Sequence, residues 1–147
     1  MAEFSKHDMK MFDLARKAAL ESTYKPFKLG TVMSYKGKVL ATGHNSRKTN
    51  PLQKKYNRKY RTFRENGQPI HDYLHAEIDC LLNIPKCIDV NLDYSKVKVY
   101  TYRICNGKRF NFGLARSCPA CLHALRDKGI QHFYYTGDDS FIYEKVY

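Results

Sequence analysis

Two short motifs constrain this chain more than any other feature of its sequence. His75-Ala76-Glu77 forms an H-x-E triplet, and Cys118 and Cys121 form a C-x-x-C pair later in the chain. Imidazole and thiolate groups are preferred zinc ligands, and a catalytic zinc takes three protein ligands where a structural zinc takes four. The three ligands offered by His75, Cys118 and Cys121 therefore predict a catalytic zinc site.

The spacing within each motif predicts separate roles for its residues. Residues two apart on a helix diverge by about 200°, so Glu77 would flank the metal held by His75 and would not ligate it. Cys118 and Cys121 are three apart, so at a helix start they would share one face and reach one ion. The N–H groups and the dipole of that helix start favour thiolate over thiol. Glu77 is left as the candidate proton carrier.

Other uses of these residues stay open. A lone C-x-x-C pair is common in structural zinc sites and redox proteins, although a redox function would leave His75 and Glu77 unexplained. The chain has five cysteines, an odd number that fits no paired extracellular framework. We expect Cys80, Cys87 and Cys105 to be reduced thiols, and a second metal at Cys80 or Cys87 is the alternative.

Hydrophobic periodicity predicts one layered domain. Apolar residues recur at helical spacing through residues 5–20 after a Ser5 N-cap, and a hairpin over residues 31–43 turns at Lys36-Gly37. Helices are expected over both motifs, the second ending at Gly129, and strands over residues 97–102, 130–135 and 141–146. This order predicts an α/β fold, a three-layer α/β/α sandwich on a mixed five-stranded sheet.

Length and hydropathy bound the class of protein. The chain has 147 residues, of which 43% are hydrophobic, enough for one core and a single domain over residues 1–147. No stretch approaches the roughly 20 apolar residues of a membrane span, and residues 1–6 lack the apolar core of a signal peptide. We therefore expect a cytoplasmic protein with no membrane partner.

Positive charge gathers in a basic insertion over about residues 47–70, with a helix expected over residues 52–63. The net charge is +12, which favours polyanions or anionic small substrates. Between residues 47 and 64 the cations are interleaved with aromatic residues, which are Tyr56, Tyr60 and Phe63. This mixture is typical of a groove for single-stranded nucleic acid, of a contact to a substrate phosphate, or of a solvated surface.

Taken together, the motifs resemble the signature of the zinc-dependent cytidine and deoxycytidylate deaminase superfamily, H-x-E followed by P-C-x-x-C. Ser117 stands where that signature usually has proline. Gly43-His44-Asn45-Ser46 is similar to the family's substrate-binding asparagine segment, and residues 75–83 and 134–138 look most like deoxycytidylate-type enzymes. The resemblance covers most of the chain and implies a cytidine deaminase-like fold.

The resemblance also implies an activity, which is conversion of a cytosine nucleotide (deoxycytidylate or cytidine-type) to the uracil nucleotide with release of ammonia. His75, Cys118 and Cys121 would hold Zn²⁺, and Glu77 would carry protons from water to the base and to the leaving amine. The residues with implied substrate contacts are Asn45, His44, Ala76, Ser117 and Tyr135. We assign Asn45 to a sugar hydroxyl, although it could be a turn asparagine. Relatives of this type are often oligomers, which implies a homo-oligomer.

Two alternatives differ from this expectation. A deaminase acting on single-stranded DNA or on tRNA would fit the basic insertion, and its turnover would fall steeply with salt. The tRNA enzymes share H-A-E, but residues 122–125 do not match their usual continuation. A non-catalytic, zinc-stabilised nucleic-acid-binding module would also fit the cations, but it would have no need of Glu77.

Overall fold

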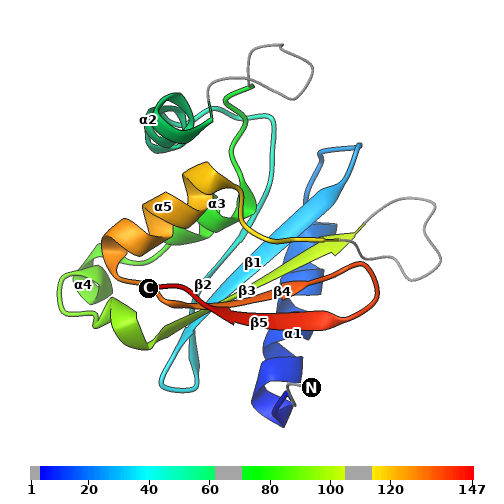
Figure 1. Ribbon diagram of the computed structural model, residues 1–147, viewed down its shortest axis with the longest axis vertical. Helices are drawn as coiled ribbons and strands as arrows, with labels where there is room; N and C mark the ends of the chain where they lie inside the picture. Colours follow the sequence, from blue (N-terminus) through cyan, green and yellow to red (C-terminus); the bar gives the residue numbers. More distant parts are fainter. Residues whose placement is uncertain (1–3, 62–70, 105–113) are drawn as a thin grey trace.

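A mixed five-stranded sheet forms the middle of the protein, with the strand order β2-β1-β3-β4-β5 (Figure 1). The computed structural model describes residues 4–61, 71–104 and 114–147. The strands are β1 (Lys28–Tyr35), β2 (Lys38–His44), β3 (Val97–Ile104), β4 (His132–Thr136) and β5 (Phe141–Lys145). Only β3 and β4 pair in parallel, while the other neighbours are antiparallel. The expected mixed sheet is confirmed.

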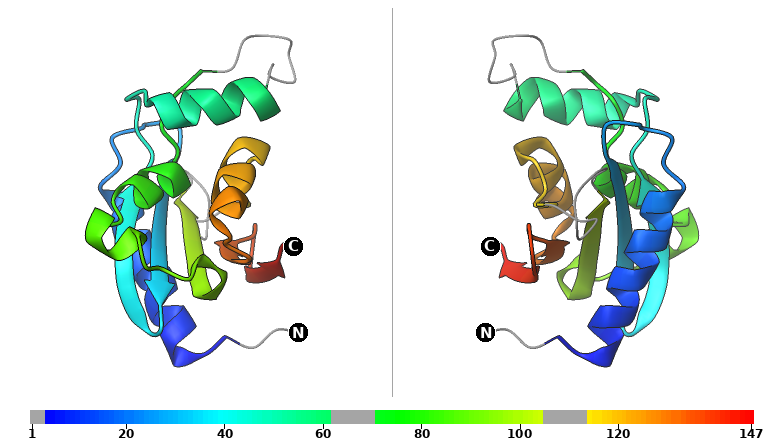
Figure 2. Two further views of the ribbon diagram at one scale, coloured as in Figure 1. Left: turned by 90° about the vertical axis from the view of Figure 1, so that its left-hand side faces the viewer. Right: turned by 90° about the vertical axis from the view of Figure 1, so that its right-hand side faces the viewer.

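Helices cover both faces of this sheet, so the three-layer α/β/α sandwich is also confirmed (Figure 2). One face carries α1 (Lys6–Leu20), and the other carries α3 (Ala76–Leu82) and α5 (Pro119–Lys128). Above α3 and α5 lies α2 (Pro51–Tyr60), the helix of the basic insertion. The short α4 (Lys86–Asp89) and the 3-10 helix η1 (Tyr94–Lys96) connect α3 to β3 and were not predicted.

The face under α1 is apolar and aromatic. Ser5 caps the helix in a capping box, since it accepts the Asp8 N–H while the Asp8 carboxylate accepts the Ser5 N–H. Phe12 packs edge-on against Tyr100, and the Tyr100 hydroxyl donates a 2.6 Å hydrogen bond to Asp8. Asp8, a buried carboxylate of this layer, therefore has its hydrogen-bond partners.

Two glycines let the helices approach the sheet closely. A Cβ at Gly30 of β1 would lie 2.1 Å from the backbone oxygen of Ala15 in α1. A Cβ at Gly43 of β2 would lie 2.4 Å from the backbone nitrogen of Cys80 in α3. Both distances are far below van der Waals contact, so a side chain at either position would push one helix off the sheet.

Within the described ranges, no helix combines the length and the apolar character that a bilayer span needs. Phe63 and Cys105 lie outside those ranges.

Candidate metal centre and cavity

The starts of α3 and α5 bring the two sequence motifs together. His75 is the N-cap of α3 and Cys118 is the N-cap of α5, with Cys121 one turn further along. His75 Nδ1 lies 3.4 Å from the Cys118 sulfur and 3.3 Å from the Cys121 sulfur. All three ligand atoms lie within 4.8 Å of one another, and the described part of the chain holds no other such group of three.

These distances fit one zinc ion. With bonds of about 2.3 Å to sulfur and 2.0–2.1 Å to nitrogen, the ligand atoms of a tetrahedral zinc lie about 3.3–3.8 Å apart. A hydrogen bond from Cys121 lowers the pKa of the Cys118 thiol below its ordinary value, and the His75 ring acts in the same direction. Burial raises the pKa of Cys121.

Glu77 shares the cavity with these ligands but does not join them. Because His75 is an N-cap with extended backbone, at φ −84° and ψ 154°, the helical divergence expected from sequence does not describe this pair. Glu77 is 3% exposed, and its Oε1 has no hydrogen-bond partner among the described residues. Burial raises the pKa of this carboxyl, while His75 acts to lower it. A buried carboxylate oxygen without a protein partner is costly unless a ligand or a water bonds to it.

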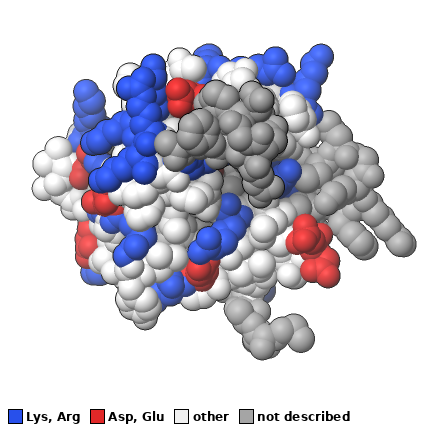
Figure 3. Space-filling view, turned by 45° about the horizontal axis from the view of Figure 1, so that its top comes forward, with Lys and Arg blue, Asp and Glu red and all other residues white. Residues whose placement is uncertain are grey.

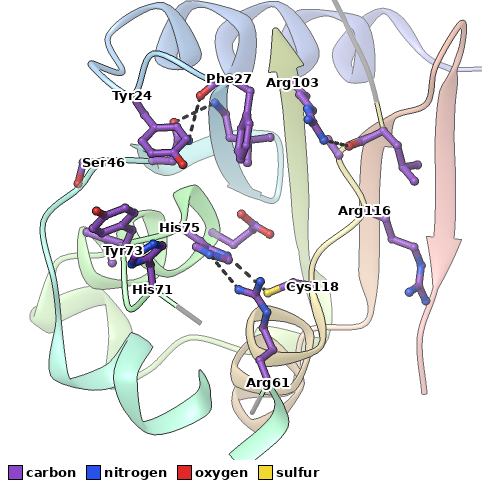
Figure 4. Close-up of a pocket in the computed structure, with 16 residues that line it drawn as sticks. Tyr24, Phe27, Ser46, Arg61, His71, Tyr73, His75, Arg103, Arg116 and Cys118 are labelled. Carbon is purple, nitrogen blue, oxygen red and sulfur yellow. Dashed lines mark hydrogen bonds between the residues drawn. The ribbon is translucent and has the colours of Figure 1, made fainter. Parts of the chain in front are cut away.

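A cavity of about 490 Å³ opens beside the candidate metal centre, within the size range of small-molecule sites. Aromatic rings of Tyr24, Phe27 and Tyr73 line one side, and arginines reach it from other elements (Figure 4). The lining arginines are Arg61, Arg103 and Arg116. Glu77 is the one acid among the described lining residues. The cavity therefore combines flat apolar walls with positive charge.

The three arginines differ in how their charge is used. Arg116 makes two parallel 2.9 Å bonds to Glu144. Arg103 lies over the Phe27 ring, at 4.5 Å from its centre, and donates to a backbone oxygen. Arg61 places Nη1 3.2 Å from His75 Nε2. A guanidinium only donates, so this contact is a hydrogen bond in the tautomer with its proton on Nδ1, whereas a ring that ligates zinc through Nδ1 carries its proton on Nε2. Neither Arg61 nor Arg103 has a described carboxylate partner.

Of the residues with implied substrate contacts, the structure brings Asn45 to the cavity. Its amide oxygen accepts from the Ser22 hydroxyl at 2.6 Å and from the Leu29 N–H at 3.0 Å, and its nitrogen donates to the Phe27 oxygen at 3.2 Å. One amide hydrogen of Asn45 is not used in these bonds. The residues with implied contacts that do not line the cavity are His44, Ala76, Ser117 and Tyr135. Their substrate contacts stay predictions.

The basic insertion has two unlike faces. Tyr56 donates a 2.6 Å hydrogen bond to Asp127, and the Tyr60 ring stacks on His123 with centres 3.7 Å apart. Both rings therefore face α5 and are not exposed stacking surfaces for bases. Lysines and arginines gather on the outside of the same helix (Figure 3), at the exposed positions Lys54, Lys55, Arg58 and Lys59. The helix ends at Tyr60, three residues before the expected end.

The remaining described cysteines do not build a second metal site. Cys80 is buried in α3 and its thiol contacts the Ala41 backbone oxygen at 3.3 Å. Cys87 is exposed. Neither belongs to a group of three potential ligands among the residues that the structure describes.

Sequence comparison and structural comparison give different results. No model of a known protein family matches the chain, and no curated protein sequence matches it. A dCMP deaminase from the cyanophage S-TIM5, solved in complex with dCMP and dUMP, matches with a TM-score of 0.57 and 18% identity over 93% of this chain and 85% of that one. A cytidine deaminase from Burkholderia pseudomallei matches with a TM-score of 0.59 and 15% identity, over 97% of this chain and 93% of that one. The chain thus has the cytidine deaminase-like fold, with a His/Cys/Cys cluster that has the geometry of a zinc site.

Proposed function

We propose that this protein is a zinc-dependent hydrolytic deaminase that converts a cytosine nucleotide to the uracil nucleotide and releases ammonia. The observation that carries the proposal is the unpartnered Oε1 of Glu77 in the cavity that also exposes His75 and Cys118. A purely structural metal site gains nothing from such a carboxylate and bears the cost of burying it. A site for proton transfer requires it.

Bound by His75, Cys118 and Cys121, zinc would act as a Lewis acid that lowers the pKa of a water molecule. Glu77 would take one proton from the attacking water and pass it to N3 of the cytosine ring. Once the water oxygen is bonded to C4, Glu77 would take the proton of that new hydroxyl and give it to the amine, so that the C4–N bond breaks, ammonia leaves and a C4 carbonyl remains. Burial raises the pKa of Glu77 above the ordinary value of a carboxyl group, which suits a group that must both gain and lose a proton.

Positive charge in the cavity supports a nucleotide over a nucleoside. Arg61 contacts His75 and so lies beside the reacting base, whereas Arg103 reaches the cavity from β3. We therefore assign Arg103 to the substrate phosphate and the unused amide hydrogen of Asn45 to a sugar hydroxyl. The cyanophage enzyme of similar fold was solved with dCMP and dUMP. A homo-oligomer is proposed on the family resemblance alone.

Arg103→Gln tests the phosphate assignment. Loss of one charged hydrogen bond costs about 1.5–3 kcal/mol, so kcat/KM for deoxycytidylate should fall about 10- to 100-fold. Deoxycytidine, which has no phosphate, should be turned over as before. Arg116→Gln is the matched control, because Arg116 is held by Glu144. An equal loss on both substrates would reject the assignment.

The exposed cations of α2 favour one second candidate, a deaminase of single-stranded nucleic acid. Ammonia release should be measured from cytidine, deoxycytidine, deoxycytidylate, single-stranded DNA and tRNA, with zinc analysis of the same preparation. We expect the highest kcat/KM on deoxycytidylate and about one zinc per chain. Activity confined to the polynucleotides, falling steeply with salt, would contradict the proposed substrate and support the second candidate.

A further inference from the structure

We propose that Gln53 of α2 is a positioning residue of the metal centre, because its buried carboxamide bonds the backbone of the candidate ligand His75. The inference rests on the metal site of the proposed function. The Gln53 oxygen accepts the backbone N–H of His75 at 3.0 Å. Tyr56, on the next turn of α2, belongs to the same hydrophobic cluster as Cys121. α2 thus contacts the starts of both α3 and α5, and Gln53 makes the polar contact to α3.

A chain of buried amides fixes which way the Gln53 carboxamide points. The Asp72 carboxylate can only accept, so Asn57 turns its nitrogen toward Asp72, at 3.2 Å. The Asn57 oxygen then accepts from Gln53 Nε2 at 3.0 Å, which leaves the Gln53 oxygen for His75. Gln53 is 0% exposed and Asn57 is 1% exposed. Because the two buried amides bond one another and each has a second fixed partner, the carboxamides are held in a single arrangement.

The inner face of α2 extends this contact along the helix. Gln53, Asn57 and Arg61 are four residues apart, so they share one side of the helix. Gln53 bonds the backbone of His75, and Arg61 meets the far nitrogen of its ring. The basic insertion therefore supports the metal centre with one face while its other face carries exposed lysines and arginines. Partners of this kind orient metal ligands, and their loss weakens metal binding about 10- to 100-fold.

Two substitutions in the full-length protein test this role. Gln53→Glu keeps the size of the side chain but removes both N–H donors and places a negative charge against the Asn57 amide oxygen. Gln53→Met keeps the length and removes every hydrogen bond. Gln131→Glu is the matched control, because Gln131 lies before β4 and is absent from the cavity lining. Zinc affinity is measured by chelator competition. The geometry of the ligands is followed by the absorption spectrum of the Co²⁺-loaded protein, and stability is measured by thermal unfolding of the metal-free protein.

We expect both Gln53 variants to bind Zn²⁺ about 10- to 100-fold more weakly than the wild type and to shift the thiolate-to-Co²⁺ absorption bands. The control should match the wild type. A role in packing alone would lower the unfolding temperature of the metal-free protein and leave zinc affinity and the Co²⁺ spectrum unchanged, and that result would overturn the inference. Failure of the wild type itself to bind Zn²⁺ would instead overturn the proposed function, and this inference with it.

Discussion

The two faces of the sheet treat buried polar groups in opposite ways. Under α1, the Asp8 carboxylate is bonded to Tyr100 and Ser5, and the surrounding rings pack against one another. Under α3 and α5, Glu77 is equally buried but keeps an oxygen without a described partner. Buried polar groups are normally paired because an unpaired one costs about 1–3 kcal/mol. The polar group under α1 is thus paired within the fold, whereas the opposite face leaves a buried oxygen that a ligand or a water can bond.

Glu77→Gln should produce the largest effect and sharpen this contrast. We expect kcat to fall about 10²- to 10⁴-fold, because general acid–base catalysis is lost. Zinc content should stay near that of the wild type, since Glu77 is not a ligand. The metal-free protein should be no less stable, because the amide avoids burying a charge. Turnover is measured by ammonia release and stability by thermal unfolding; retained turnover would contradict the role of Glu77.

Phe12→Ala should produce the opposite pattern on the α1 face. Phe12 is 1% exposed and stacks on Phe141 with ring centres 4.2 Å apart, so its truncation should cost about 3–5 kcal/mol of unfolding free energy. Turnover per folded molecule should not change. Met9→Ala, at an exposed position of the same helix, is the control and should cost under about 0.5 kcal/mol. If Phe12→Ala does not fold, Phe12→Leu gives a smaller loss with the same pattern.

The two close-contact glycines allow the same substitution on each face. Gly30→Ala pushes against α1 and Gly43→Ala against α3, and overpacking of this kind costs about 1–3 kcal/mol. We expect Gly30→Ala to lower the stability and to leave zinc affinity and turnover unchanged. Gly43→Ala should also lower zinc affinity and turnover, because α3 carries Glu77 and begins at His75. Equal effects of the two variants on turnover would show that the faces are not functionally distinct.

The smallest predicted effect concerns pH and Asp8. Burial raises the pKa of Asp8, but hydrogen bonds from Tyr100 and Ser5 outweigh it, so the pKa lies below its ordinary 3.8. The ionised carboxylate therefore adds stability above pH 3.8, and this stability is lost as the pH falls through the lower folded value. Asp8→Asn should cost about 1 kcal/mol at pH 7. Unfolding curves are measured from pH 7 to pH 2. The difference in unfolding free energy between the variant and the wild type should vanish at the acid end, and turnover at pH 7 should not change.

Sequence predicted apolar and metal-binding features better than buried amides. The Ser5 cap, the turn at Lys36-Gly37 and the left-handed cap at Gly129 follow from local chemistry and are confirmed. The ligand cluster was predicted because few residue types bind zinc and their spacing is restricted. Gln53 was missed, because a buried glutamine has no hydrophobic pattern and its partners are distant in sequence.

The aromatic residues of the basic insertion show the same limit. Alternation with cations suggested base stacking for Tyr56 and Tyr60, but the direction of a side chain depends on which helix lies beside it. That neighbour is α5, which offers Asp127 and His123 as partners. Arg103 likewise had no sequence signal, since it reaches the cavity only through the position of β3.

X-ray absorption at the zinc edge of the purified protein tests the central claim most directly, because it counts the atoms bound to the ion. The account predicts two sulfurs at about 2.3 Å, one imidazole nitrogen and one light-atom ligand from outside the protein at about 2.0 Å. Glu77→Gln should give the same ligand count. A third sulfur or a second imidazole on the ion, or no zinc in metal-replete protein, would contradict it.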